Sequence, residues 1–206
     1  MSGGRLPPRQ GNLFTAGNGE ATADGAGPLP PPLLRAQLLA WQDRLAAHQG
    51  PRFRREAAAP GESQGLLFAS PALNSAALAF DPLALEAQSL SFWRWPAAPH
   101  QGAAVYLVLD RPPQLCEPLL LYVGETGRAD LRWKGDHDCK SYLAAYSEAL
   151  RKADLAPQLS IRFWSDVPPA PAARRALEQE LIRHWLPPFN KETRGRWATP
   201  FTADLP

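Results

Sequence analysis

Two short runs of β-branched, aromatic and leucine side chains constrain the fold of this chain more than any other feature. Residues 105–109 (VYLVL) and 119–123 (LLLYV) each have the length and composition of a strand. The proline-rich stretch between them, residues 110–118, predicts a hairpin with a long connection. A third short run, residues 159–164, predicts another strand.

Helical spacing follows these strands. Residues 130–153 carry apolar side chains that predict one or two helices, and Leu177, Leu181 and Trp185 fall at i, i+4 and i+8 of a helix over residues 172–185. The order is strand, strand, helix or helices, strand, helix. We expect an α/β (α+β) domain over residues 101–200, in which a small mixed or antiparallel three-stranded sheet is flanked by helices.

The N-terminal half has a different character. Residues 1–32 are rich in Gly, Pro and Ala and predict a disordered tail. Residues 33–100 predict a helical and irregular region. Its clearest part, residues 33–48, predicts an amphipathic helix that Gly50-Pro51 ends, while residues 89–95 suggest an extended segment. The apolar positions of that helix are Leu34, Leu38, Trp41 and Leu45.

Composition narrows the class of protein. The chain is 45% hydrophobic and 20% charged, with a formal net charge of only +2, so its overall charge does not announce a nucleic-acid partner. Cys116 and Cys139 are its only cysteines, which favours a reducing compartment over a disulfide framework. Residues 1–12 show no signal-peptide pattern, and no apolar run approaches a membrane span. We expect a cytoplasmic protein with no membrane contact.

Five separated elements share their order and spacing with one known family. They are Val105-Tyr106, with Ala104 where the family has glycine, then Tyr122-Val123-Gly124, Arg132-Trp133-Lys134, Ala176-Leu177-Glu178 and Pro187-Pro188-Phe189-Asn190. Together they resemble the GIY-YIG nucleases over residues 103–197, about half of the chain. The resemblance implies a metal-dependent DNA endonuclease.

The chemistry gives independent reasons for the residue types. Mg²⁺ or Mn²⁺ prefers oxygen ligands, and Mg²⁺ keeps most of its waters, so one carboxylate on a rigid helix suffices to hold it. Glu178 is placed for that role, although a lone glutamate is more often a solvated helix residue. Arg132 supplies a permanent planar cation for the scissile phosphate. Asn190 is expected to fix the geometry by hydrogen bonding.

The identity of the general base stays open. Tyr106 and Tyr122 lie on neighbouring predicted strands, and the resemblance implies that one of them activates or positions the attacking water. A phenol is a poor base at neutral pH, but a metal and an arginine nearby would favour its phenolate. Where many family members place a tyrosine or histidine, this chain has Asp136, with His137 next to it. Either His137 takes that role or the site uses fewer groups.

Four basic residues are candidates for contacts with DNA phosphates: Lys134, Lys191, Arg194 and Arg196. They are equally compatible with ordinary solvated charges. No helix-turn-helix, zinc finger or other reader module is recognisable, so we expect a nucleoid-associated enzyme that acts on duplex, nicked or branched DNA by its structure. The run of residues 136–139 has metal-binding side chains, but neighbours on a helix point apart and do not easily share an ion.

Two short segments fit the pattern Q-x-x-L-F. One contains Gln10, Leu13 and Phe14, and the other contains Gln64, Leu67 and Phe68. Both resemble the linear motif by which bacterial replication and repair proteins bind the β sliding clamp, where a Leu-Phe pair enters an apolar pocket. Alternatively, the second pair packs onto the nuclease domain and the first has no role.

The competing function is a catalytically weak GIY-YIG domain that serves as a DNA-binding or clamp-tethered adaptor. Two departures motivate it: the displaced His137, and the run 125–127, where some family members carry a lysine. A homing or mobile-element nuclease is a third possibility, but that class usually carries a DNA-reading module.

Overall fold

The computed structural model describes residues 35–56, 77, 79–91, 100–134 and 138–199. All of them belong to one compact unit within Pro32–Pro206. The predictions for the N-terminal tail, for both Q-x-x-L-F segments, for His137 and for most of the segment 89–95 therefore lie outside the described residues. In the described part, no helix is both long and apolar enough to cross a membrane.

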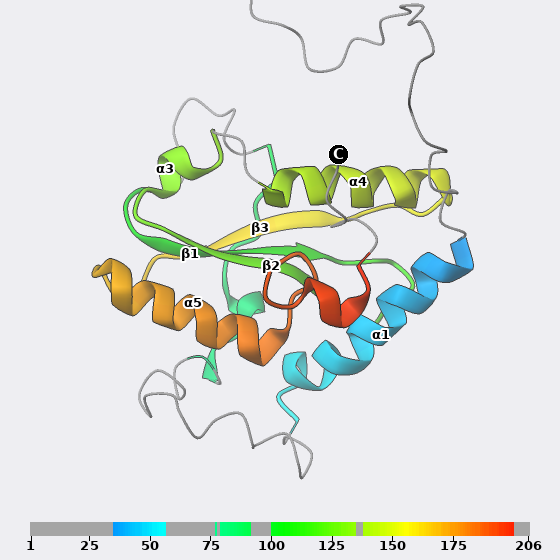
Figure 1. The fold of residues 1–206 in the computed structure, drawn as a ribbon, viewed down its shortest axis with the longest axis horizontal. Helices are drawn as coiled ribbons and strands as arrows, with labels where there is room; N and C mark the ends of the chain where they lie inside the picture. The colour runs from blue at the N-terminus through cyan, green and yellow to red at the C-terminus, as the bar shows by residue number, and fades with distance from the viewer. Residues whose placement is uncertain (1–34, 57–76, 78, 92–99, 135–137, 200–206) are drawn as a thin grey trace, which may run out of the picture. The chain divides into compact units, whose positions relative to one another are not determined.

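Three antiparallel strands form the sheet: β1 (Ala104–Asp110), β2 (Leu119–Thr126) and β3 (Leu159–Trp164). Their order is β2-β1-β3, so β1 is central and β2 lies at an edge (Figure 1). All seven residues of β1 are buried, as expected for a strand covered on both faces. The prediction of a small three-stranded sheet is confirmed, and of the two alternatives left open, mixed or antiparallel, the structure has the antiparallel one.

Helices cover both faces of the sheet. The chain continues from β2 through the short helix α3 (Ala129–Arg132) into α4 (Asp138–Lys152), so residues 130–153 form two helices. Figure 1 shows α4 on one face and α5 (Pro171–Trp185) on the other. Side chains alternate accordingly along β1: Tyr106 and Val108 pack in the core with α4, while Leu107 and Leu109 pack in the core with α5. The domain is a mixed α/β fold.

The helix α1 (Arg35–Phe53) crosses the start of β2 and joins the two helical layers. At its start, Arg35 donates hydrogen bonds to Ala153 and Asp154 O, just after α4. At its end, the ring of Phe53 lies 4.6 Å from that of Trp185 in α5. The helix therefore contributes to the same hydrophobic core as the sheet.

The prediction that Gly50-Pro51 ends this helix is wrong, because α1 continues through both residues to Phe53. Tertiary contacts hold the last turn. Gln49 donates to Trp185 O at 3.1 Å, and Arg52 donates to His184 O at 2.8 Å. Proline costs a helix one hydrogen bond, and these contacts with α5 outweigh that local preference.

Candidate functional site

The edge of β2 that faces away from β1 is hydrogen-bonded by the turn after α5 and by the side chain of Asn190, in the place where a further strand would otherwise pair. Asn190 accepts from Val123 N at 3.0 Å and donates to Val123 O at 2.8 Å, and it is buried. Phe189 N donates to Leu121 O at 3.0 Å, two residues earlier on the same edge. Unpaired strand edges are costly when buried, so these bonds fix the turn after α5 rigidly against the sheet.

That turn begins at an unusual backbone conformation. Leu186 follows α5 with a φ of +48°, and its N–H donates to Ile182 O at 2.8 Å. This left-handed cap ends the helix and redirects the chain toward β2. The Thr193 hydroxyl donates to Pro187 O and closes the turn on itself.

Glu178 lies beside the same edge, one residue beyond the core side chain Leu177. Its Oε1 accepts from Glu125 N, at the end of β2, at 3.0 Å. The pKa of Glu178 is raised to about 7, first by burial and then by the nearby charge of Glu125, while the backbone hydrogen bond from Glu125 N opposes both. The charge of Arg132 also lowers this pKa. The carboxylate is therefore held in place and titrates near neutral pH.

A buried ion pair supports the end of β2. Arg174 is only 3% exposed and its Nε lies 2.7 Å from Glu125 Oε2. It also donates to Pro169 O at 2.9 Å. We did not anticipate either residue from the sequence. The available signals were that Arg174 precedes Glu178 by one helical turn and that Glu125 follows Gly124.

The two signature tyrosines meet on one face of the sheet. The rings of Tyr106 and Tyr122 are stacked with centroids 5.9 Å apart, and their hydroxyls are hydrogen-bonded. Arg132 Nε donates to the Tyr106 hydroxyl at 3.1 Å. Gly124 pairs with Tyr106 across the strands, and a Cβ there would collide with the rings of both tyrosines. Glycine is thus required at this position for the tyrosines to lie together.

Burial dominates the ionisation of both tyrosines. It raises the pKa of Tyr106 to about 12, although Arg132 favours the phenolate. It raises the pKa of Tyr122 further, with the neighbouring Tyr106 adding to the shift. Arg132 favours the phenolate of Tyr106 as expected, but desolvation outweighs this attraction. The expected effect of a metal on these phenols stays a prediction. At neutral pH both hydroxyls are protonated and can donate hydrogen bonds.

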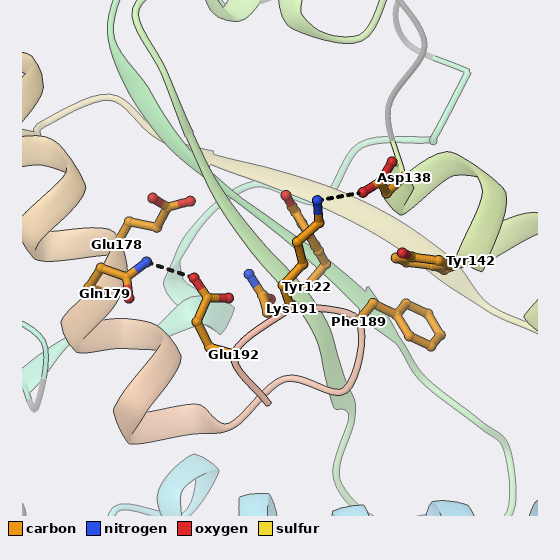
Figure 2. Close-up of a pocket in the computed structure, with 9 residues that line it drawn as sticks. Tyr122, Asp138, Tyr142, Glu178, Gln179, Phe189, Lys191 and Glu192 are labelled. Carbon is orange, nitrogen blue, oxygen red and sulfur yellow. Dashed lines mark hydrogen bonds and ion pairs between the residues drawn. The ribbon is translucent and has the colours of Figure 1, made fainter. Parts of the chain in front are cut away.

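A pocket of about 160 Å³ opens between α5, β2 and the start of α4 (Figure 2). Within it, Gln179 donates to Glu192 at 3.0 Å, and Lys191 Nζ lies 3.2 Å from Asp138 Oδ2. Nine residues line the pocket: Tyr122, Asp138, Tyr142, Glu178, Gln179, Phe189, Asn190, Lys191 and Glu192. The candidates Tyr122, Glu178 and Asn190 thus share one cavity with Lys191, and Tyr106 and Arg132 adjoin it through Tyr122.

The other predicted basic contacts lie outside the lining of this pocket. Arg194 donates to the hydroxyl of Tyr142, which is a lining residue, at 3.2 Å. The guanidinium of Arg196 lies over the ring of its neighbour Trp197, 5.9 Å from the centroid. Lys134 is exposed in the turn after α3. Lys191 is the one predicted phosphate contact that reaches the cavity.

The donor set suits a hard cation that prefers oxygen ligands more than a softer metal ion that prefers thiolate or imidazole ligands. Over the described ranges, no group of three or more His, Cys, Asp or Glu side chains is arranged to hold a metal ion. Glu178 presents a half-buried carboxylate to the pocket, whose other charged acceptors are Asp138 and Glu192. Mg²⁺ and Mn²⁺ accept such all-oxygen surroundings, and Mg²⁺ is commonly held by one or two carboxylates, with waters and substrate phosphates completing its shell. The residues present fit an ion of this kind.

Comparison of the chain with protein-family models, with curated proteins and with solved structures finds no match. The likeness to the GIY-YIG nucleases therefore rests on the motifs in the sequence.

Proposed function

We propose that this protein is a metal-dependent DNA endonuclease of the GIY-YIG type, which hydrolyses phosphodiester bonds in the pocket beside β2. One observation carries the proposal. Tyr106, Tyr122, Arg132, Glu178 and Asn190 come from five separate segments, and they gather near the β2 edge of a small sheet. A set of polar groups that converges on an open pocket is the arrangement expected of an active site.

Each residue has a chemical role in this proposal. Glu178 would hold Mg²⁺ or Mn²⁺, which when bound supplies Lewis-acid stabilisation of the charge that develops on the phosphoryl oxygens. Arg132 would bind the scissile phosphate through its planar guanidinium. Asn190 keeps the turn against β2, so that the pocket retains its shape during binding.

The tyrosines serve as hydrogen-bonding groups in this scheme. Because burial raises the pKa of both tyrosines, their hydroxyls are neutral, and that of Tyr122, which lines the pocket, can orient a water or a phosphate oxygen. Glu178, with a pKa of about 7, is the group near the pocket that changes charge in the physiological range. Loss of its proton is needed for it to hold a cation, so we expect cutting to increase as the pH rises through 7.

The expected substrate is duplex DNA that carries a nick, branch or other structural feature. The test is a panel of labelled intact, nicked, branched and mismatched duplexes, incubated with the full chain in Mg²⁺, Mn²⁺ or EDTA. We expect cutting of at least one substrate in the presence of the metal, none in EDTA, and its loss in Glu178→Gln. Full cutting by that variant would contradict the assignment of the site.

A matched control is Glu148→Gln. Glu148 is an exposed glutamate near the end of α4 and pairs with Arg151 and Lys152 on the helix surface. It has the same side-chain chemistry as Glu178 but lies away from the lining of the pocket. Wild-type cutting by this variant is expected, which separates a local effect from a general change of charge.

The competing proposal is an adaptor that binds DNA without cutting it. Metal-independent binding by the wild-type protein to every member of the panel, with no product in Mg²⁺ or Mn²⁺, would favour it. Recruitment by the sliding clamp through the two Q-x-x-L-F segments stays a prediction from the sequence.

A further inference from the structure

The side chains that line the pocket carry more negative than positive charge, and this excess disfavours a phosphate ligand. Three of its side chains are carboxylates, Asp138, Glu178 and Glu192, and one is a cation, Lys191. A phosphodiester that enters such a cavity meets several like charges, and a positive group at short range is needed to offset them. Among the nine lining side chains, Lys191 alone can supply that charge.

Lys191 combines a fixed backbone with a movable amine. The residue before it, Asn190, is bonded to both backbone groups of Val123, and Thr193 N donates to Asn190 O at 3.1 Å. The side chain of Lys191, by contrast, is 73% exposed. Lysine carries a compact charge on a flexible stem, so its amine can change partners while its position on the turn stays constant.

The present partner of the amine is replaceable. Figure 2 shows Lys191 reaching from the turn after α5 to Asp138, where Nζ and Oδ2 are 3.2 Å apart. Asp138 is 59% exposed and lies in the first turn of α4. Ion pairs this exposed are weak because water screens them. A phosphate, which offers a full charge and several acceptor oxygens, can compete for the same amine.

We propose that Lys191 contacts a backbone phosphate of the DNA bound in this pocket, and that Asp138 holds the Lys191 amine in the unbound protein and releases it when the DNA binds. The inference rests on the proposed function because it takes DNA as the ligand. It adds a substrate-binding residue and a partner that competes with the substrate.

The first test measures binding without cutting. A nicked, fluorescein-labelled duplex is titrated with the full chain in EDTA at several salt concentrations. Loss of one phosphate contact lowers the slope of log K against log salt by about 1. We expect this change in Lys191→Gln and none in Lys152→Gln. Lys152 is a matched control because it is 58% exposed and also forms an exposed pair, with Glu148.

The second test asks whether Asp138 acts through Lys191. Asp138→Asn should tighten binding of the duplex in the wild-type background, because the amine no longer has to leave a carboxylate. In the Lys191→Gln background the same change should have no effect. Equal effects in both backgrounds would mean that Asp138 acts only as a general negative charge, and would overturn its role.

The outcomes are distinguishable from those of the proposed function. Cutting that needs Glu178, with an unchanged salt slope in Lys191→Gln, would overturn this inference alone. If the salt slopes of the variants are as expected but the protein cuts no DNA in Mg²⁺ or Mn²⁺, the proposed nuclease activity is contradicted. Lys191 is then still a phosphate contact. No binding by the wild-type protein, or displacement of the duplex by inorganic phosphate at the same phosphate concentration, would overturn the assignment to DNA.

Discussion

Two polar clusters lie toward opposite ends of β1 and differ in whether their polar groups reach the pocket. Near one end, the open cluster consists of Tyr106, Tyr122, Arg132 and Glu178, and two of its members line the pocket. At the other end, the closed cluster consists of Asp110, Tyr146, Gln42 and Gln114. Both clusters pair tyrosine hydroxyls with charged side chains, yet we assign chemistry to only one of them.

The hydrogen bonds of the closed cluster join different elements of the protein. Tyr146 donates to Asp110 Oδ2 at 2.7 Å, and Gln42 donates to the Tyr146 hydroxyl at 2.6 Å. Gln114 donates to Gln42 at 2.6 Å, and Gln158 N donates to Asp110 Oδ1 at 2.7 Å. The cluster therefore ties α1 and α4 to the sheet, as buried polar networks do when their members are bonded.

The open cluster differs because part of its bonding capacity faces the pocket. Glu178 gives one oxygen to Glu125 N and stands at the cavity with a pKa raised to about 7. The comparison teaches that burial alone does not mark a functional site. A functional site is marked by a titratable group that is largely buried and held in place, yet still reaches solvent beside other charged groups.

The largest expected effect on stability comes from the support beneath the open cluster. Arg174→Ala leaves the mostly buried carboxylate of Glu125 with only the exposed Arg175 as an ionic partner, and removing the buried partner of such a pair costs about 3–5 kcal/mol. Urea unfolding measures it. Arg175→Ala is the control, because Arg175 lies 3.4 Å from the same carboxylate but is 69% exposed, and we expect a loss of only about 0–1 kcal/mol. Equal losses of stability in the two variants would contradict the claim that burial makes the pair of Arg174 and Glu125 the stronger one.

The second expected effect is a change in stability that depends on pH. The folded protein raises the pKa of Glu178 from 4.5 to about 7, so it binds this proton more tightly than the unfolded chain does. The resulting stabilisation is present below pH 4.5 and is lost as the pH rises through 7. Glu178→Gln cannot ionise, so in EDTA it should gain about 2 kcal/mol over the wild type between pH 5 and pH 8.

Thermal or urea unfolding at the two pH values checks this prediction. Glu148→Gln, whose parent side chain is exposed, should show no such gain. A constant difference between Glu178→Gln and the wild type across the range would mean that Glu178 is already ionised at pH 5. The carboxylate would then be an ordinary solvated group.

A third expected effect, similar in size to the second, separates the two clusters by function. Tyr146→Phe removes the hydroxyl between Gln42 and Asp110 and should cost about 1–3 kcal/mol, because buried polar groups lose a partner. We expect the folded variant to cut DNA at the wild-type rate. Tyr106→Phe removes the hydroxyl that Arg132 contacts and should lower the cutting rate. If Tyr146→Phe lowered that rate as much as Tyr106→Phe, the distinction between the clusters would fail.

Local patterns in the sequence were sufficient for the main elements. The run of β-branched, aromatic and leucine side chains at residues 105–109 predicted β1, and the spacing of Leu177, Leu181 and Trp185 predicted α5. The local rule failed at Gly50-Pro51, where contacts with α5 extend α1 past a sequence that favours a helix end. Periodicity describes which face is buried, but it does not include such distant contacts.

The candidate site was less accessible to sequence reasoning. The motif spacing placed Glu178 on the last helix and Asn190 in the turn after it, yet it could not indicate that Arg174 pairs with Glu125, 49 residues away. Nor could it predict that burial would keep Tyr106 protonated beside Arg132, because desolvation depends on the whole packed environment.

The most direct measurement is the rate of cutting of the preferred duplex at pH 8 in saturating Mg²⁺ or Mn²⁺, compared between the wild type, Glu178→Gln and Glu148→Gln. We predict that Glu178→Gln lowers the rate by roughly 10²–10³-fold, the loss typical of removing one preorganised charge-stabilising group, and that Glu148→Gln has no effect. Equal rates in all three proteins, or no metal-dependent cutting by the wild type, would contradict the proposed nuclease site.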